Sequence, residues 1–358
     1  MDDALKLEEM AAFFEKRLDG YDAHMRSEIE GASQFYAFTA EQLPAGRAAE
    51  VLDLGCGTGL ELEEYFRLNP DAAVTGIDLC QPMLDALAAK FPGRRLNLVC
   101  ASYFEAELPA AAYDAAVSVE SLHHFPAEQK LSLYRKLCAA LREDGYFILT
   151  DYFAESEALE KEYFANLETL KREQQLDDRH FYHYDTPLTV EHEMAVLAEA
   201  GFGDVRILRR WGSACTVYAG KHAVEIRPVT AEDRRFWFSL DRHLPEGEFD
   251  RKVRDRMGYV LTVDGEPTGL LRYHLFWDNT PFCTMLFVRG SDQRKGYGRR
   301  LVRHWEQEMK RLGYGLVMTS TRADEKAQHF YRKLGYRDCG SFFPDEGQPL
   351  ELIMLRKL

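Results

Sequence analysis

Three glycines at alternate positions, within Gly55-Cys56-Gly57-Thr58-Gly59, are the residues whose spacing most directly predicts ligand chemistry. They follow the apolar run Ala49–Leu54, broken only by Glu50 and Asp53, which is typical of a buried parallel strand. They precede Leu60–Phe66, whose periodicity predicts a helix. Glycine tolerates positive φ and close backbone approach, and the free N–H groups of a helix start face the ligand. The segment therefore predicts a ligand-binding turn between a strand and a helix.

A carboxylate, Asp78, ends the next predicted strand, Ala73–Ile77. At that position it can accept hydrogen bonds from both hydroxyls of a ribose. The glycines read Gly-x-Gly-x-Gly and not the Gly-x-Gly-x-x-Gly of a dinucleotide site. Together with Asp53, this pattern resembles motif I of class I S-adenosylmethionine (SAM) methyltransferases. The alternative is a strand-turn-helix of another doubly wound fold.

The resemblance implies SAM contacts from the glycine turn and from the ends of the following strands. The implied residues are Asp53, Gly55, Cys56, Gly57, Gly59, Asp78, Leu79, Met83, Ser102, Tyr103 and Glu120. Leu79 and Met83 stand where the family packs against adenine, and Ser102 stands where it usually has an acidic residue. Glu120 begins the segment Glu120–Phe125, which resembles motif IV of small-molecule methyltransferases. Because ligands of open α/β sheets bind beyond the carboxyl ends of the strands, this segment should line the cleft.

The pair His123-His124 raises the question of a metal ion or a general base. Adjacent histidines are expected to project in different directions, and no further Cys or His cluster completes a tetrahedral site, so no metal is predicted. We take His124, together with Tyr21 and Tyr184, as candidate contacts of the methyl acceptor. The alternatives are a packed Tyr21, a structural histidine, and a 179–185 segment that only tethers the chain through its aromatic rings.

Helices and strands alternate around these residues in the order of a methyltransferase. Residues 1–45 predict a helical cap, with helices Leu5–Leu18 and Ser27–Gln42 joined by a turn at 19–22. Residues 46–221 predict a Rossmann-like seven-stranded sheet whose last two strands form an antiparallel pair. Residues 153–190 predict an acidic, helical insertion.

A second glycine-containing loop, Gln293–Gly298, follows the predicted strand Cys283–Val288 and opens an amphipathic helix over Tyr297–Leu312. Successive N–H groups at a helix start bind anions, and the helix dipole adds to this. Basic side chains in and beside the loop add positive charge, although they could equally be solvated. The loop therefore predicts a phosphate site.

The loop resembles the Gln/Arg-x-x-Gly-x-Gly signature of GNAT N-acetyltransferases, and the resemblance covers residues 223–358. It implies an α+β domain that binds acetyl-CoA. The implied cofactor contacts are Phe287, Val288, Gln293, Arg294, Lys295, Gly296, Tyr297, Gly298, Arg299 and Ala327. The N–H of Val288 is the expected donor to the developing oxyanion.

Tyr331, within Ala327–Tyr336, corresponds to the family's tyrosine that protonates the departing CoA thiolate. The alternative is a core aromatic. The family's frequent Asn before this segment is Asp324 here. Trp277 and Asp278, in a predicted loop between strands, are candidate contacts of the accepting amine, although Asp278 could simply form a turn.

Length and composition limit the class of protein. A chain of 358 residues suits two domains, and no apolar run is long enough to span a bilayer. The acidic start predicts no signal peptide, and seven scattered cysteines are typical of a reduced, cytoplasmic enzyme. A net charge of −14 argues against a nucleic-acid partner.

The two halves together predict a bifunctional transferase, with SAM and acetyl-CoA as cofactors and small molecules as substrates. Two alternatives remain. In one, a single domain is active and the other senses a cofactor or acts as a scaffold. In the other, the chain modifies a protein or an RNA. The sequence does not determine the oligomeric state.

Overall fold

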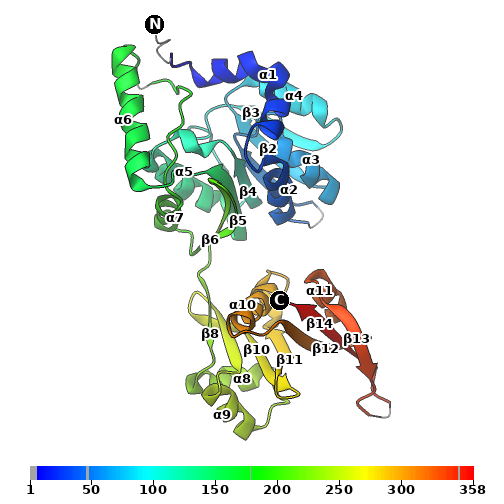
Figure 1. Ribbon diagram of the computed structural model, residues 1–358. Coiled ribbons are helices and arrows are strands. Elements are labelled where there is room, and N and C mark those ends of the chain that lie inside the picture. Colours follow the sequence, from blue (N-terminus) through cyan, green and yellow to red (C-terminus); the bar gives the residue numbers. More distant parts are fainter. Residues whose placement is uncertain (1–5, 46–47, 178, 346) are drawn as a thin grey trace. The chain divides into compact units, whose positions relative to one another are not determined.

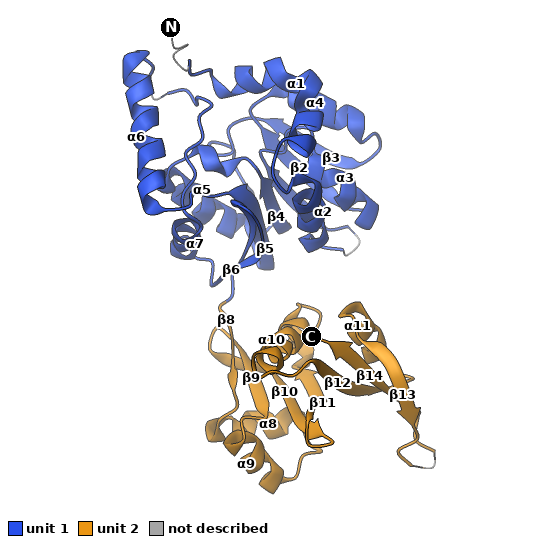
Figure 2. Cartoon of the chain, viewed as in Figure 1, with its two compact units in different colours: residues 1–222 blue, residues 223–358 orange. Residues whose placement is uncertain are grey.

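The computed structural model describes residues 6–45, 48–177, 179–345 and 347–358. The chain divides into two compact units, Met1–His222 and Ala223–Leu358 (Figure 2). The predicted border between the cap and the methyltransferase sheet touches residues 46 and 47, which lie outside the described residues.

Unit 1 contains a seven-stranded sheet in the order β3-β2-β1-β4-β5-β7-β6 (Figure 1). The first five strands run parallel, and β7 lies antiparallel to both β5 and β6. The strands are β1 (Glu50–Leu54), β2 (Ala73–Asp78), β3 (Arg95–Cys100), β4 (Tyr113–Val119), β5 (Leu141–Tyr152), β6 (Asp204–Trp211) and β7 (Ala214–Gly220). This sheet confirms the predicted Rossmann-like class and its antiparallel last pair.

Helices cover both faces of this sheet. They are α1 (Met10–Ser27), α2 (Ala32–Gln42), α3 (Leu60–Leu68), α4 (Gln81–Lys90), α5 (Ala127–Ala140), α6 (Glu157–Glu173) and α7 (Val190–Glu199). The alternation of strand side chains builds two cores, since Leu52 and Leu54 pack toward α5 and α7 whereas Val51 packs toward α2 and α3. Unit 1 is therefore a three-layer sandwich that holds the carboxyl ends of β1, β2 and β4 at one edge.

The N-terminal cap differs from its prediction. α1 (Met10–Ser27) runs without interruption through the expected turn at 19–22, and α2 is Ala32–Gln42. The start expected at Leu5 lies outside the described residues. Gly20 costs a helix only about 1 kcal/mol, which the packing of the remaining turns offsets. The chain turns instead at Gly31, where φ is 80° and a Cβ would lie 2.7 Å from Trp211 Cβ.

Unit 2 is built on a second seven-stranded sheet, in the order β13-β14-β12-β11-β10-β9-β8. Its strands are β8 (Val224–Pro228), β9 (Gly258–Val263), β10 (Glu266–Phe276), β11 (Thr280–Val288), β12 (Leu316–Arg322), β13 (Arg337–Phe342) and β14 (Glu351–Lys357). Its helices are α8 (Arg234–Leu240), α9 (Glu246–Arg254), α10 (Tyr297–Arg311) and α11 (Ala327–Lys333). One core joins α10 and α11 to the sheet, and another core, around Trp237 and Phe249, joins α8 and α9 to it. The α+β class is as predicted.

Two neighbouring strands of unit 2 separate along their length. β11 and β12 are parallel and pair only at Phe282–Met318 and Cys283–Thr319. Beyond this point β11 stays paired with β10 through Val288, and β12 stays paired with β14 through Arg322. The sheet therefore splits between β11 and β12 just after Cys283, and the split exposes backbone groups of both strands.

None of the helices among the described residues combines the length and the apolar character that a bilayer crossing requires. All seven cysteines lie in the described ranges, and each has a free thiol.

Candidate functional site

The glycine turn of unit 1 has the backbone that its sequence predicts. φ is 72° at Gly55, 46° at Gly57 and 71° at Gly59. A Cβ on Gly55 would lie 2.0 Å from Ser121 Oγ, so no larger residue fits without a shift. The carboxylate of Asp78 accepts hydrogen bonds from the N–H groups of Gly57 and Cys80, each at 2.9 Å. Asp78 therefore positions the turn as well as facing the space above it.

A cavity of about 520 Å³, including space open to solvent, lies above this turn. Its walls come from the turn, from the ends of β2 and β4 and from α1. They are formed by Met10, Ala11, Phe14, Tyr21, Gly55, Gly57, Asp78, Leu79, Cys80, Met83, Tyr103, Glu120, Ser121 and His124. Seven of the eleven predicted SAM contacts thus line one cavity.

The other four predicted contacts lie behind this wall. Asp53 is buried beneath the turn, and Cys56 packs against Gly76, where an added Cβ would lie 2.7 Å from its Sγ. Gly59 is the left-handed residue that starts α3. The hydroxyl of Ser102 accepts a hydrogen bond from the N–H of Phe104 at 3.3 Å. In this structure none of these four residues lines the cavity.

Buried carboxyl groups lie at the cavity wall and beneath it: Asp78 and Glu120 line the cavity, and Asp53 and Glu61 do not. Desolvation raises the pKa of Asp53 and of its neighbour Glu61, and burial also raises the pKa of Asp78. Burial and the nearby Asp151 raise the pKa of Glu120 to about 8, and Glu120 Oε1 has no partner among the described residues. Glu120 also sits at φ 50°, an uncommon conformation for this residue type. The site therefore gains from a positively charged ligand, which would stabilise these carboxylates.

A second, larger hollow of about 1740 Å³, again including open space, adjoins the first. Both share Phe14, Tyr21, Glu120 and His124, so these four residues stand at the junction. The larger hollow is also bordered by further residues of α1, of the short turn after β4 and of the insertion, among them Phe13, Arg17, His24, His123, His183 and Asp185. Two of the predicted acceptor contacts, Tyr21 and His124, therefore lie between the smaller cavity and the adjoining hollow.

The segment 181–185 reaches this hollow because it is tied to the N-terminus. Glu9 and Tyr182 form an antiparallel bridge, and the N–H of Met10 donates to the carbonyl of Phe181 at 2.8 Å. The ring of His183 stacks on Phe13 at 3.5 Å between centroids. The segment therefore tethers the chain and also lines the hollow. The ring of the third predicted contact, Tyr184, is not among the lining side chains, whereas Asp185 and His183 are.

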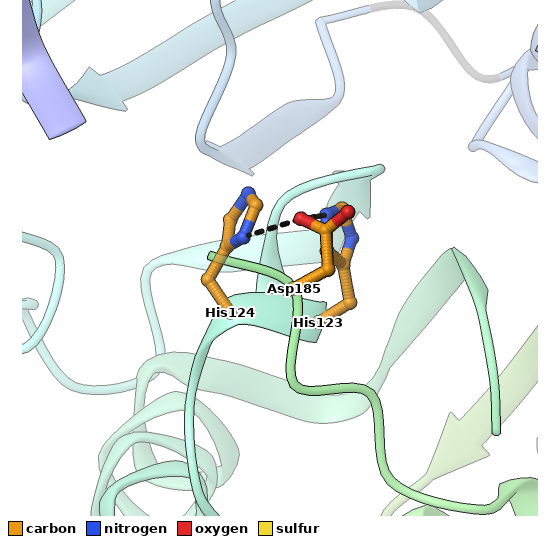
Figure 3. Close-up of side chains that lie close together, drawn as sticks. All are labelled: His123, His124 and Asp185. Atoms are coloured by element: carbon orange, nitrogen blue, oxygen red, sulfur yellow. Dashed lines mark ion pairs between the residues drawn. The ribbon is translucent and has the colours of Figure 1, made fainter. Parts of the chain in front are cut away.

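The expectation that His123 and His124 diverge is wrong. Their ring centroids lie 3.9 Å apart on the short turn η1 (Leu122–His124), and both face the carboxylate of Asp185 (Figure 3). His124 Nδ1 lies 3.2 Å and His123 Nε2 lies 3.5 Å from Asp185 Oδ1. Rotation about the side-chain bonds overrides the divergence of the Cα–Cβ vectors because Asp185 attracts both rings.

Asp151, at the end of β5, is a residue that the sequence reasoning missed. Its Oδ1 lies 2.6 Å from His123 Nδ1, and its Oδ2 accepts from the N–H groups of Leu122 and His123. Although desolvation opposes charge on His123, Asp151 and Asp185 raise its pKa to about 10. The signal that could have found Asp151 is its place at the carboxyl end of the strand next to β4.

The predicted anion loop of unit 2 lies between β11 and α10. Gly296 has φ 89° and Arg294 has φ 70°, and α10 begins directly after Gly296. The side-chain amide of Gln293 donates to the carbonyl of Val288 at 3.0 Å, so this residue fixes the loop to the end of β11. Lys295 pairs with Asp292 at 3.3 Å, while Arg294 and Arg299 have no ion pair among the described residues. The helix start is thus surrounded by exposed positive charge.

Tyr331, on α11, lies at the point where β11 and β12 part. Its hydroxyl group interacts with the side chains of Thr319 and Cys283, the last pair that joins the two strands. Burial raises the pKa of this phenol well above its ordinary value, so it holds its proton. Ala327 begins the same helix, which places both predicted residues on one short element.

The remaining predicted residues of unit 2 lie at its surface or on β11. Trp277 is 76% exposed in the turn between β10 and β11, and both Trp277 and Asp278 have positive φ. Phe287 is 37% exposed, next to the buried Val288. Asp324 pairs with Arg322 at 2.8 Å. Nothing in this arrangement brings Trp277 and Asp278 together with Tyr331.

Two families match this chain, one in each unit. The family described as "Methyltransferase domain" matches residues 51–145, and the family described as "Acetyltransferase (GNAT) family" matches residues 225–336. The first range covers the glycine turn, Asp78 and Glu120. The second covers the anion loop and Tyr331.

Among curated proteins, a carboxy-S-adenosyl-L-methionine synthase of Campylobacter concisus is 26% identical over 190 residues, which are 49% of this chain and 78% of that protein. An uncharacterized methyltransferase of Mycobacterium bovis is 39% identical over 74 residues, 21% of this chain and 36% of that protein. Among solved structures, a putative O-methyltransferase of Nostoc punctiforme has a TM-score of 0.46 and 20% identity, over 61% of this chain and 63% of that chain.

Proposed function

We propose that this chain, which carries a methyltransferase domain and a GNAT acetyltransferase domain, transfers a methyl group from SAM in unit 1 and an acetyl group from acetyl-CoA in unit 2. One observation carries the proposal. Each unit has a glycine-containing loop between a strand and a helix, and the charge around each loop is opposite in sign. Carboxyl groups surround the turn of unit 1, and basic side chains surround the loop of unit 2. These charges suit a cationic sulfonium and an anionic pyrophosphate respectively.

Methyl transfer needs little from the protein beyond alignment, because the sulfonium is already activated. SAM in the smaller cavity would place its ribose at Asp78 and its adenine at Leu79 and Met83. The methyl group would then point to the junction formed by Tyr21, Glu120 and His124, with the acceptor in the larger hollow. The adjacency of the two spaces supports this arrangement.

Acetyl transfer needs a donor for the developing oxyanion and a proton for the departing thiolate. The thioester would lie in the split between β11 and β12 beside the backbone of Val288, with Tyr331 near the last pair that joins the two strands. The pyrophosphate would lie on the loop that starts α10. The protonated phenol supports Tyr331 as the acid.

Small molecules are the proposed acceptors in both units, and the cytoplasm is the proposed compartment. Both cavities of unit 1 are bordered by residues of α1, and the larger one also by His183 and Asp185, which supports an acceptor small enough to lie between these elements. The net charge of −14 disfavours RNA.

The test uses the full chain. Calorimetry should show one SAM and one acetyl-CoA site, and each cofactor should raise the thermal stability of the chain, by about 2.7 kcal/mol at a hundredfold excess over Kd. A library of amines and hydroxy compounds is then incubated with radiolabelled SAM or acetyl-CoA. Mass spectrometry of the products separates methyl transfer from modification of SAM itself, the reaction named for the Campylobacter concisus relative.

Three results would contradict the proposal. Binding of one cofactor only would leave a single active domain. Label found on a protein or an RNA would point to a macromolecular acceptor. Binding of both cofactors with turnover of neither, over a broad library, would point to a sensing or scaffolding module.

A further inference from the structure

Among the described residues, one grouping of metal-ligating side chains in unit 1 consists of His123, His124 and Asp185. One ligand atom from each lies within 4.8 Å of the other two. The rings come from the short turn after β4, and the carboxylate comes from a loop that the chain reaches only after α6 (Figure 3). Together they form a two-histidine, one-carboxylate set, which is a common ligand set for catalytic divalent ions.

The spacing of these atoms suits one ion. Ligand atoms at about 2.1 Å from a tetrahedral centre lie roughly 3.4 Å from each other. Asp185 Oδ1 lies 3.5 Å from His123 Nε2 and 3.2 Å from His124 Nδ1. Small rotations of the side chains would therefore bring all three into the coordination sphere without movement of the backbone.

A supporting contact fixes the first imidazole. His123 Nδ1 lies 2.6 Å from Asp151, whose other oxygen accepts from two backbone N–H groups. A carboxylate that accepts from Nδ1–H leaves the lone pair of Nε2 directed at the ion, which is the usual arrangement behind a metal-bound histidine. The alternative set Glu120, His123 and Asp151 is less suitable, because Asp151 is already occupied by these three donors.

All three ligands also line the larger hollow of unit 1. Both histidine side chains are buried, whereas the side chain of Asp185 is 48% exposed. An ion held here would keep the coordination positions that face the hollow open to water or to a ligand. A site with three protein ligands and an open position is typical of a catalytic ion and not of a structural one.

We propose that His123 Nε2, His124 Nδ1 and Asp185 Oδ1 form a site for a divalent transition-metal ion of the Zn²⁺ type, open toward the larger hollow. Imidazole ligands disfavour Mg²⁺ and Ca²⁺, which prefer oxygen. The ion would bind an oxygen of the methyl acceptor; this role rests on the proposed function, whereas the binding of the ion does not. Since Tyr184 O also lies 3.2 Å from His124 Nδ1, the ion must displace the hydrogen bond to that carbonyl.

The experiment measures metal binding by the full chain after treatment with a chelator. Zn²⁺ is titrated in competition with a chromogenic chelator, and Co²⁺ is added separately to read the coordination number from its visible spectrum. We expect one ion per chain and a four-coordinate Co²⁺ spectrum. Asp185→Asn should weaken Zn²⁺ binding by at least tenfold, and Asp151→Asn by about 10- to 100-fold.

The chain offers a matched control. Asp177 and His180 form an exposed pair at 3.0 Å in the same insertion. Asp177→Asn therefore removes a carboxylate that faces a histidine, as Asp185→Asn does, but outside the proposed metal site. Its Zn²⁺ affinity should equal that of the unchanged chain. If Asp151→Asn fails to fold, His124→Gln serves as the second ligand variant.

Absence of stoichiometric Zn²⁺ and Co²⁺ binding, or equal binding by Asp185→Asn and the unchanged chain, would overturn the proposal. SAM affinity is measured on the metal-free chain in the same series. A chain that binds Zn²⁺ but not SAM retains this site and loses the proposed methyl transfer. A chain that binds SAM but not Zn²⁺ retains the proposed SAM site and loses the proposed metal site.

Discussion

Each unit of this chain has a glycine-containing loop between a strand and a helix, and the charges around the two loops are opposite in sign. In unit 1 three glycines at positive φ bring the turn against the carboxylate of Asp78, which accepts the N–H of Gly57. In unit 2 the loop leads directly into α10, whose N-cap, Gly296, provides no side-chain hydrogen bond, and exposed basic side chains lie beside it in the chain. A turn that is bonded to a carboxylate offers acceptors to ligand hydroxyls, whereas the start of a helix offers donors to an anion.

The comparison teaches that glycine spacing specifies the path of the backbone, and that side chains around it select the ligand. In unit 1 the buried carboxyl groups make the ligand-free site less stable, because burial removes the water that would solvate their charges. The charges of unit 2 are exposed and solvated, so its ligand-free loop is not destabilised in this way. The predictions below test this contrast.

The largest expected effect is a loss of stability in unit 1 that leaves unit 2 unchanged. Lys130 and Glu193 form a buried pair at 2.6 Å in unit 1. Lys130→Met leaves Glu193 buried without its cationic partner, with the Tyr134 hydroxyl as its remaining donor, and should lower the free energy of unfolding of unit 1 by about 3–5 kcal/mol. Calorimetry should show the unit 1 transition shifted and the unit 2 transition unchanged. Lys161→Met, at an exposed pair, should change neither. A joint shift of both transitions would mean that the units do not unfold separately.

The second prediction concerns the carboxylate of the glycine turn. Asp78→Ala removes an acceptor for the ribose and should weaken SAM binding by about 1–3 kcal/mol. Acetyl-CoA affinity should stay the same. Asp85→Ala, an exposed change on α4, is the control. Unchanged SAM affinity in a folded Asp78→Ala chain would exclude Asp78 as a ribose contact.

The third prediction concerns the acid of unit 2. Tyr331→Phe keeps the ring and should leave acetyl-CoA affinity nearly unchanged, while acetylation slows by roughly 10- to 100-fold. Tyr336→Phe, whose ring lies 5.3 Å away in the same core, is the matched control and should keep its rate. Equal rates for the Tyr331→Phe and unchanged chains, measured where chemistry limits turnover, would assign the proton to another donor.

The smallest expected effect tests the charge contrast directly. Raising the salt concentration from 0.05 to 0.5 M should weaken acetyl-CoA binding by about three- to tenfold, because exposed charges are screened. SAM binding should change by less than about twofold, since the carboxyl groups of its cavity are buried. Calorimetry at the two salt concentrations measures both. An equal effect of salt on the binding of both cofactors would contradict the difference between exposed charges in unit 2 and buried charges in unit 1.

The sequence by itself determined the features that are local in the chain. Apolar runs, helical periodicity, the glycine spacing and the carboxylate after Ala73–Ile77 predicted the turn at Gly55–Gly59 and the place of Asp78, and the resemblance to two families implied both sheets. Such features depend on a few consecutive residues and on the general rule that strand ends hold the ligand. The same reasoning misplaced the turn of the cap, because Asp19-Gly20 is a local turn signal that packing overrides.

Only the tertiary structure decided how distant segments meet. Asp185 reaches His123 and His124 because residues 181–183 pair with residues 8–10 at the other end of unit 1. Asp151 reaches His123 because β5 lies beside β4 in the sheet. Contacts between residues far apart in the chain depend on the packing of whole elements, and the spacing of residues along one segment carries no information about them. The candidate metal ligands are therefore visible in the fold, where the sequence predicted none.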